Sequence, residues 1–107
     1  MKVELLYFDG CPSHDAFLPR LHELLAQAEV DVAVQQRRVE SDEAAMRERF
    51  LGSPTLRVNG ADVDLGAGDR TYYGLQCRLY PTGKGLRGAP PDEGVLNALQ
   101  HARDPAG

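Results

Sequence analysis

A junction near the N-terminus, where an apolar strand-like segment stops at Gly10 and a helix follows, constrains the fold of this chain more than any other feature. Residues 2–8 (KVELLYF) are mostly apolar and have the length of a buried strand. From Ser13 to Ala28 apolar residues recur at helical spacing, although Pro19 within this segment predicts a kink or a late regular start. Residues 30–39 alternate and contain four valines, which favours a second strand. Strand, helix and strand at this spacing predict a right-handed parallel unit.

The rest of the chain continues the alternation of helices and strands. In order, the predicted elements are a helix from Ser41 to Gly52, a strand over 56–60, a loop over 61–74, a strand over 75–80, a loop over 81–91 and a helix that begins at Asp92. An Asn-Gly pair ends the third strand and signals a tight turn. The last two strands are expected to pair antiparallel despite the long connection between them.

These elements predict an α/β chain with a central mixed four-stranded sheet, three flanking helices and the order β-α-β-α-β-β-α. Residues 1–107 are expected to form one domain, with a frayed tail over 104–107. The formal net charge of −4 offers no basic field for nucleic acid or an anionic membrane. Neither a membrane-spanning stretch nor a signal peptide is found, so we expect a cytoplasmic protein.

Cys11 stands where the first predicted strand has ended and the first predicted helix begins. The first backbone N–H groups of a helix lack partners within it, and with the helix dipole they favour a thiolate over a thiol. The thiolate is the nucleophilic form, so Cys11 is a candidate nucleophile; the alternative is a small buried side chain. His14 lies one helical turn further on and can share a proton with Cys11, unless it is only a solvated helix residue.

These features resemble the thioredoxin-like superfamily, in its minimal, glutaredoxin-like version. The motif Cys11-Pro12-Ser13-His14 stands where that family has Cys-x-x-Cys, and Pro19 stands where thioredoxins commonly carry a kinking proline. The tripeptide Ser53-Pro54-Thr55 matches the cis-proline loop of the family. The resemblance implies that the Ser53–Pro54 bond is cis, that this loop faces Cys11, and that an extended substrate binds there. The substrate-binding residues would be Pro12, Ser53, Pro54 and Thr55.

Residues 74–80 also resemble a segment of small thioredoxin-family proteins that are sometimes labelled as alkylmercury-lyase related. The chain has only two cysteines, Cys11 and Cys77, and lacks a set that would hold and protonolyse an organomercurial. No metal site is expected either. Zinc needs about four protein ligands, or three and a water, and no further clear Cys/His pair accompanies Cys11 and His14.

The chain departs from the thioredoxin pattern at one decisive position, because His14 replaces the resolving cysteine. A dithiol enzyme uses that second thiol to release its mixed disulfide. Three alternatives follow: a monothiol enzyme resolved by glutathione or a similar small thiol, a distant resolver in Cys77, or the loss of redox catalysis. For Cys77 the structural alternative is a strand residue that packs into the core.

Two hypotheses for the function follow from these residues. The first is a thioredoxin-like thiol–disulfide oxidoreductase, with Cys11, His14 and Cys77 as catalytic residues and a protein or small-molecule thiol or disulfide as substrate. It needs no cofactor, although glutathione or another low-molecular-weight thiol can serve as co-substrate. The second is a non-catalytic module that binds a partner peptide or small thiol in the same groove. In either case we expect a monomer or a weak homodimer.

Overall fold

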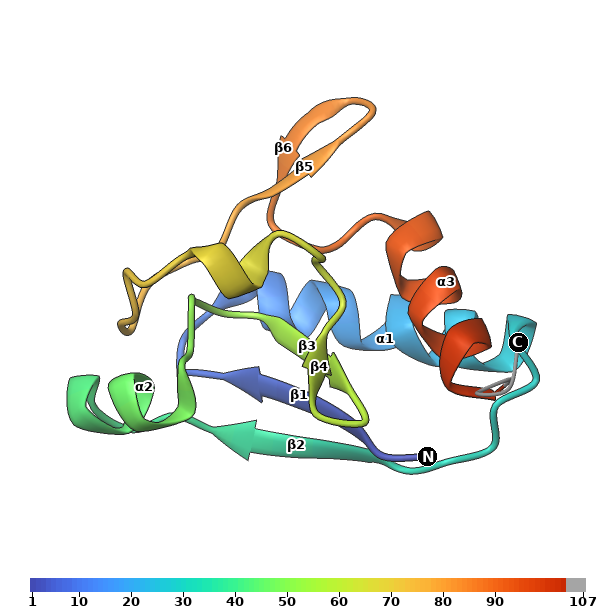
Figure 1. Cartoon of the computed structure of the whole chain (residues 1–107), viewed down its shortest axis with the longest axis horizontal. Coiled ribbons are helices and arrows are strands. Elements are labelled where there is room, and N and C mark those ends of the chain that lie inside the picture. Colours follow the sequence, from blue (N-terminus) through green and yellow to red (C-terminus); the bar gives the residue numbers. More distant parts are fainter. Residues whose placement is uncertain (104–107) are drawn as a thin grey trace.

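Strand β1 (Val3–Tyr7) lies inside a four-stranded sheet with the order β2-β1-β3-β4. It pairs in parallel with β2 (Val34–Arg38) and antiparallel with β3 (Thr55–Val58), which pairs antiparallel with β4 (Ala61–Asp62). This computed structural model describes residues 1–103 (Figure 1). The mixed sheet and its three helices agree with the predicted fold class.

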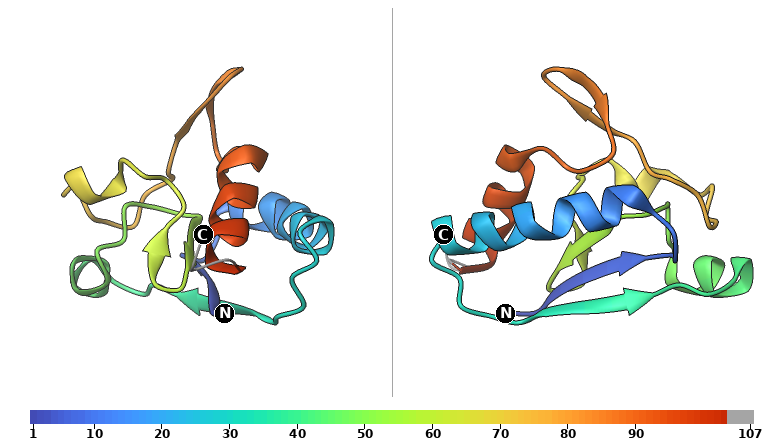
Figure 2. Two further views of the ribbon diagram at one scale, coloured as in Figure 1. Left: turned by 45° about the vertical axis from the view of Figure 1, so that its right-hand side comes forward. Right: turned by 180° about the vertical axis from the view of Figure 1, so that it is seen from behind.

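The two faces of the sheet carry separate hydrophobic cores because successive side chains of a strand point in opposite directions. Helices α1 (Pro12–Gln27) and α3 (Asp92–Arg103) lie side by side over the face of Val3 and Leu5, as two further views show (Figure 2). Leu6 packs on the opposite face with residues of α2 (Asp42–Glu48) and of the turn after it. The buried residues of this second core are Leu6, Val39, Ala45 and Phe50.

Helix α1 begins directly at Pro12 and runs without interruption through Pro19. A late regular start, one of the two expectations from Pro19, was therefore wrong. Proline is well tolerated at the first position of a helix, because the N–H that it lacks has no helical partner there. Pro19 lies on the exposed side of α1, where the helix does not contact the sheet.

The fourth strand of the sheet lies at a different place in the sequence from the predicted one. Asn59 and Gly60, with φ of 53° and 84°, form a two-residue turn, and the chain pairs with β3 immediately afterwards as β4. The prediction of a loop over 61–74 was therefore wrong at Ala61–Asp62. The prediction of a long connection between the last two strands of the sheet was also wrong, because a two-residue turn joins them. The turn itself was predicted from the Asn-Gly pair.

Residues 75–80 do not join the main sheet, which corrects the prediction of a fourth strand there. Cys77 makes one isolated parallel bridge to Ser53, and β5 (Tyr80–Thr82) begins only at the end of the segment. Strand β5 pairs with β6 (Gly85–Arg87) in a hairpin that projects from the body of the molecule (Figure 1). The predicted loops over 61–74 and 81–91 thus contain β4, the 3₁₀ turn η1 (Ala67–Asp69), and most of this hairpin.

The remaining elements differ from the prediction mainly at their ends. Strand β2 is shorter than the predicted 30–39, and α2 ends before a left-handed residue, Arg49, rather than at Gly52. Ser41 caps α2 by accepting a hydrogen bond from the amide of Ala44 at 3.0 Å, as its position predicted. Within residues 1–103, no helix is long and apolar enough to cross a membrane. The predicted frayed tail, 104–107, lies outside the described residues.

Candidate functional site

Cys11 is the N-cap residue of α1 and is almost completely buried, with 3% of its surface exposed. Its side chain makes no capping hydrogen bond. Instead, the thiol donates to the carbonyl oxygen of Ser53, with the sulfur 3.7 Å from that oxygen. The first turn of α1 and the loop before β3 therefore meet at the Cys11 sulfur, as the resemblance implied.

The peptide bond between Ser53 and Pro54 is cis, which confirms the expectation for this loop. Ser53, Pro54 and Thr55 are all buried, and the hydroxyl of Thr55 donates to the carbonyl of Gly52 at 2.6 Å. The Ser53 hydroxyl is buried without a hydrogen-bond partner among the described residues. The loop is therefore held closely against Cys11 and is not open to solvent.

A short segment of the chain itself, residues 76–78, pairs with the backbone of Ser53; we call it the strap. The Ser53 amide donates to the carbonyl of Gln76 at 2.8 Å, and the Arg78 amide donates to the carbonyl of Ser53 at 3.0 Å. These two bonds form the isolated bridge between Ser53 and Cys77. The backbone N–H and C=O of Ser53 are therefore already paired within the chain, as they would be with an added extended segment.

Two glycines permit the close packing around this site. Gly52 has a φ of +131°, and a Cβ atom there would lie 2.9 Å from the carbonyl oxygen of Gln76 in the strap. Gly88, which follows β6, lies against Ser13 in the first turn of α1, and a Cβ atom there would come within 3.2 Å of the Ser13 Cβ. The strap is therefore packed against the cis-proline loop, and the chain after the hairpin is packed against the first turn of α1.

His14 is directed away from Cys11 toward the sheet. Its ring stacks on Tyr7 with the centroids 3.9 Å apart and the planes 8° apart, and its Nε2 lies 3.1 Å from the side-chain oxygen of Gln36. Its Nδ1 lies 3.3 Å from a carboxylate oxygen of Asp15. With 8% of its surface exposed, His14 is not a solvated helix residue. Both ring nitrogens have partners other than Cys11, and a role in tuning the thiol stays a prediction.

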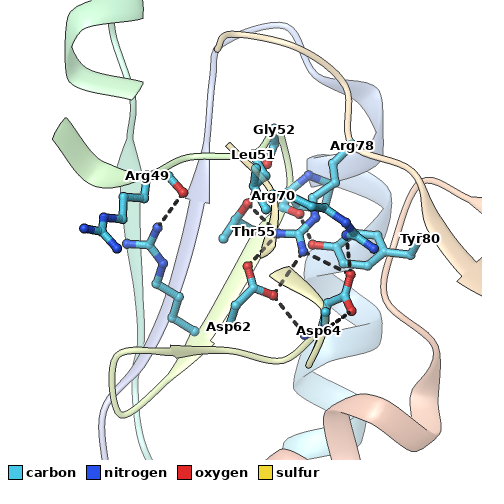
Figure 3. Close-up of polar contacts among 12 residues, drawn as sticks. Arg49, Leu51, Gly52, Thr55, Asp62, Asp64, Arg70, Arg78 and Tyr80 are labelled. Atoms are coloured by element: carbon cyan, nitrogen blue, oxygen red, sulfur yellow. Dashed lines mark hydrogen bonds and ion pairs between the residues drawn. The ribbon is translucent and has the colours of Figure 1, made fainter. Parts of the chain in front are cut away.

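A buried arginine anchors the strap to β4 (Figure 3). Arg78 has 4% of its surface exposed, and its guanidinium forms a two-pronged ion pair with Asp62, at 2.7 and 3.1 Å. It also donates to the hydroxyl of Thr55 at 3.1 Å and lies 4.4 Å above the ring of Tyr80. Sequence reasoning missed this cluster, because one arginine between apolar residues normally marks the solvent face of a strand.

Asp64 and Arg70 complete the charged cluster around Arg78 and Asp62. Asp64 lies 2.6 Å from Arg70 and 3.5 Å from Arg78, so two carboxylates face two guanidinium groups. Burial raises the pKa of the Tyr80 hydroxyl well above its ordinary value, and this hydroxyl donates to the carbonyl of Pro54 at 2.5 Å. The cluster therefore holds both the strap and the cis-proline loop in place.

Apart from His14, the predicted site residues fall into three groups in the structure. Cys11, Ser53 and Pro54 lie together, and Thr55 continues from them into β3. Pro12 is exposed at the start of α1, beside this group. Cys77 is an exposed free thiol on the other side of Ser53, so the core-packing alternative for this residue was wrong.

A separate apolar hollow of about 660 Å³ lies between β4 and α3. Tyr80 lines it and connects it to the carbonyl of Pro54 through its hydroxyl. Among residues 1–103, no three His, Cys, Asp or Glu side chains are grouped so that they could hold a metal ion. Comparisons with protein-family models, with curated proteins and with solved structures found no match.

Proposed function

We propose that the chain has a thioredoxin-like fold and acts as a thiol–disulfide oxidoreductase with Cys11 as its redox-active thiol. The observation that carries the proposal is the 3.7 Å contact between the Cys11 sulfur and the carbonyl of Ser53, the residue before a cis proline. A cysteine at the beginning of a helix opposite such a loop is the arrangement that the resemblance implies.

The sheet topology supports the same proposal. The parallel β1–α1–β2 unit is followed by an antiparallel β3–β4 hairpin, and the final helix packs beside α1. This arrangement is compatible with a minimal thioredoxin-like layout. The fourth strand has only two residues, so the hairpin is shorter than the remainder of the sheet.

The proposed reaction needs no bound cofactor. The Cys11 thiolate attacks one sulfur of a substrate disulfide, and the other half of the substrate leaves as a thiol. A second thiol, of the class of glutathione, then attacks the mixed disulfide on the substrate's sulfur. Cys11 returns to its reduced form, and the substrate's half leaves as a disulfide with that thiol. Each exchange breaks one S–S bond and forms another, so the electrons balance.

This function is tested by the reduction of bis(2-hydroxyethyl) disulfide with reduced glutathione. We expect the wild-type protein to exceed N-acetylcysteine at the same thiol concentration, because a positioned thiol reacts faster than one free in solution. The reduction rate of Cys11→Ser should fall to that of an ordinary exposed thiol, because Cys77 is the thiol that remains. Equal rates for the wild type and Cys11→Ser would overturn the proposal.

A second candidate, a non-catalytic module for a peptide or small thiol, is favoured by the burial of Cys11 and by the strap on Ser53. This candidate predicts that a peptide binds while Cys11 resists alkylation in the folded protein. Alkylation of Cys11 by iodoacetamide, measured in a Cys77→Ser background, separates the two. Modification only on global unfolding supports the module, whereas modification through local opening supports the oxidoreductase.

A further inference from the structure

Ser53 stands between the two cysteines of the chain. Its carbonyl oxygen accepts from the Cys11 thiol at 3.7 Å and from the amide of Arg78, the neighbour of Cys77, at 3.0 Å. Standard backbone dimensions then keep the Cys11 sulfur within about 9 Å of the Cys77 Cα atom. Two cysteines that are far apart in the sequence are thus both neighbours of one loop residue.

The two thiols differ strongly in accessibility. Cys11 has 3% of its surface exposed, whereas Cys77 is exposed. The rate of thiol–disulfide exchange depends on access as well as on the fraction of thiolate. While the strap is closed, a disulfide that arrives from solution therefore meets Cys77 before it meets Cys11.

We propose that Cys77 is the thiol that first exchanges with an external disulfide and then passes the bond to Cys11. In the first step, the Cys77 thiolate attacks glutathione disulfide, which forms a Cys77–glutathione disulfide and releases one glutathione. In the second, the Cys11 thiolate attacks the Cys77 sulfur, which forms a Cys11–Cys77 disulfide and releases the second glutathione. Two protein thiols are oxidised and one disulfide is reduced to two thiols. The inference rests on the proposed redox role of Cys11.

The surroundings of Cys77 fit a small disulfide that carries carboxylates. Cys77 lies in a hollow of about 250 Å³ that Arg70 also lines. Arg70 pairs with Asp64 through one guanidinium nitrogen, and its remaining N–H groups are the donors for a ligand carboxylate. Tyr72 and Leu79 line the same hollow and are 63% and 58% exposed, so they add apolar contact surface. Glutathione disulfide combines these properties, and it is the probe that we choose.

Transfer of the disulfide bond from the Cys77–glutathione pair to Cys11 requires a movement of the strap. A disulfide needs Cα atoms about 4.4–6.8 Å apart and the two sulfurs directed at each other, whereas Cys11 is buried and Cys77 is exposed, so the Cys77 side chain must turn toward Cys11. Only two backbone hydrogen bonds hold the Cys77 bridge to Ser53, and the bridge is isolated from the regular sheet. Breaking these two bonds, together with the hydrogen bond from the Gln76 side chain to the carbonyl of Leu51, lets Cys77 turn inward while the side chain of Arg78 stays anchored on β4.

The test is mass spectrometry of the intact protein and its peptides after exposure to glutathione disulfide. We expect an internal Cys11–Cys77 disulfide in the wild type and a stable Cys77–glutathione disulfide in Cys11→Ser. In Cys77→Ser, Cys11 should be modified slower than Cys77 is in Cys11→Ser, by about tenfold or more, because it is buried. A persistent mixed disulfide on either cysteine of the wild type, or equal rates in the two variants, would overturn the inference.

These outcomes separate the inference from the function on which it rests. If Cys11→Ser loses the reductase activity while Cys77→Ser keeps it and the wild type forms no internal bond, the oxidoreductase stands and the role of Cys77 fails. If Cys11→Ser keeps the wild-type activity, the oxidoreductase itself fails. Either result is decisive, because both variants are measured in the same two assays.

A variant that displaces the strap provides a further test without altering a cysteine. In Gly52→Ala, the new Cβ meets the carbonyl of Gln76 and loosens its bond to the Ser53 amide, so the internal disulfide should form faster than in the wild type. Gly60→Ala is the matched control, because its φ of +84° imposes similar backbone strain but a Cβ atom there meets nothing within 4 Å. Equal rates of internal disulfide formation in the two variants would count against the inference.

Discussion

Arg78 and Asp62 form a two-pronged ion pair that joins the strap to the edge strand β4. The guanidinium is buried, and the hydroxyl of Thr55 and the ring of Tyr80 contact it from other directions. A buried ion pair gains stability only when its other hydrogen bonds are also satisfied. One guanidinium nitrogen of Arg78, Nε, is buried without a partner among the described residues, so these bonds are not completely satisfied. Removing one partner of the pair would still be costly, because it leaves the other charge uncompensated.

Removal of the Arg78 side-chain charge should destabilise the fold strongly. We expect Arg78→Met to lower the free energy of unfolding by about 3–5 kcal/mol, because Asp62 keeps its charge without this counter-ion, whereas Asp64 retains Arg70. Urea denaturation measures the loss. Arg38→Met is the control, since its ion pairs are exposed and should contribute little. An equal loss in both variants would contradict the role assigned to the buried pair.

Stability should fall when the solution becomes acidic, partly through Asp64. Burial alone would raise the pKa of this carboxyl, but the amide of Gly66 and the guanidinium of Arg70 outweigh burial and lower it. The contribution is complete above the ordinary carboxyl pKa of about 4 and is lost as the pH falls through the depressed native value. Asp64→Asn should flatten the dependence of the urea midpoint on pH below about 4. An unchanged slope would argue against this contribution.

His14 should act on stability through the sheet. We expect His14→Ala to lower the free energy of unfolding by about 1–3 kcal/mol, because the variant loses the stack on Tyr7 and leaves Gln36 without its partner. His22, an exposed residue of the same helix, is the control and should tolerate alanine. The pH dependence of Cys11 alkylation in both variants tests proton sharing: a profile that changes only in His14→Ala supports it.

The contact between Gly88 and Ser13 should limit access to Cys11. A Cβ atom at residue 88 must displace Ser13 or the chain after β6, and overpacking of this kind costs about 1–3 kcal/mol. In a Cys77→Ser background, Gly88→Ala should therefore speed the alkylation of Cys11 by roughly tenfold or more. Gly83→Ala, where a Cβ atom meets nothing within 4 Å, should leave the rate unchanged. If both variants react like their parent, this contact does not cover Cys11.

Local patterns in the sequence were sufficient to predict most of the framework. The apolar run of β1, the helical spacing after Cys11 and the capping Ser41 depend on neighbours within a few residues, so they were recognisable without the structure. The same holds for the Asn-Gly turn after β3 and for the position of the candidate site at the start of α1.

The segment over 75–80 shows what such patterns did not reveal. Its alternation predicts that Leu75, Cys77 and Leu79 point inward, yet these three are exposed and Arg78 is buried. The reversal occurs because Arg78 finds its counter-charge on Asp62, which reaches this place only after the chain has formed β4. Burial of a charge depends on partners that are distant in sequence, and alternation carries no information about them.

Sequence alone therefore identified the candidate nucleophile, Cys11, and its position at the beginning of a helix, and the resemblance implied that the Ser53–Pro54 loop faces it. The tertiary structure alone decided which of the two thiols meets the solvent. Cys11 is buried where its thiol contacts the cis-proline loop, on which the strap packs, and Gly88 lies against the neighbouring Ser13, while Cys77 stays exposed on the strap. Accessibility results from packing between segments far apart along the chain, whereas a helix start follows from adjacent residues.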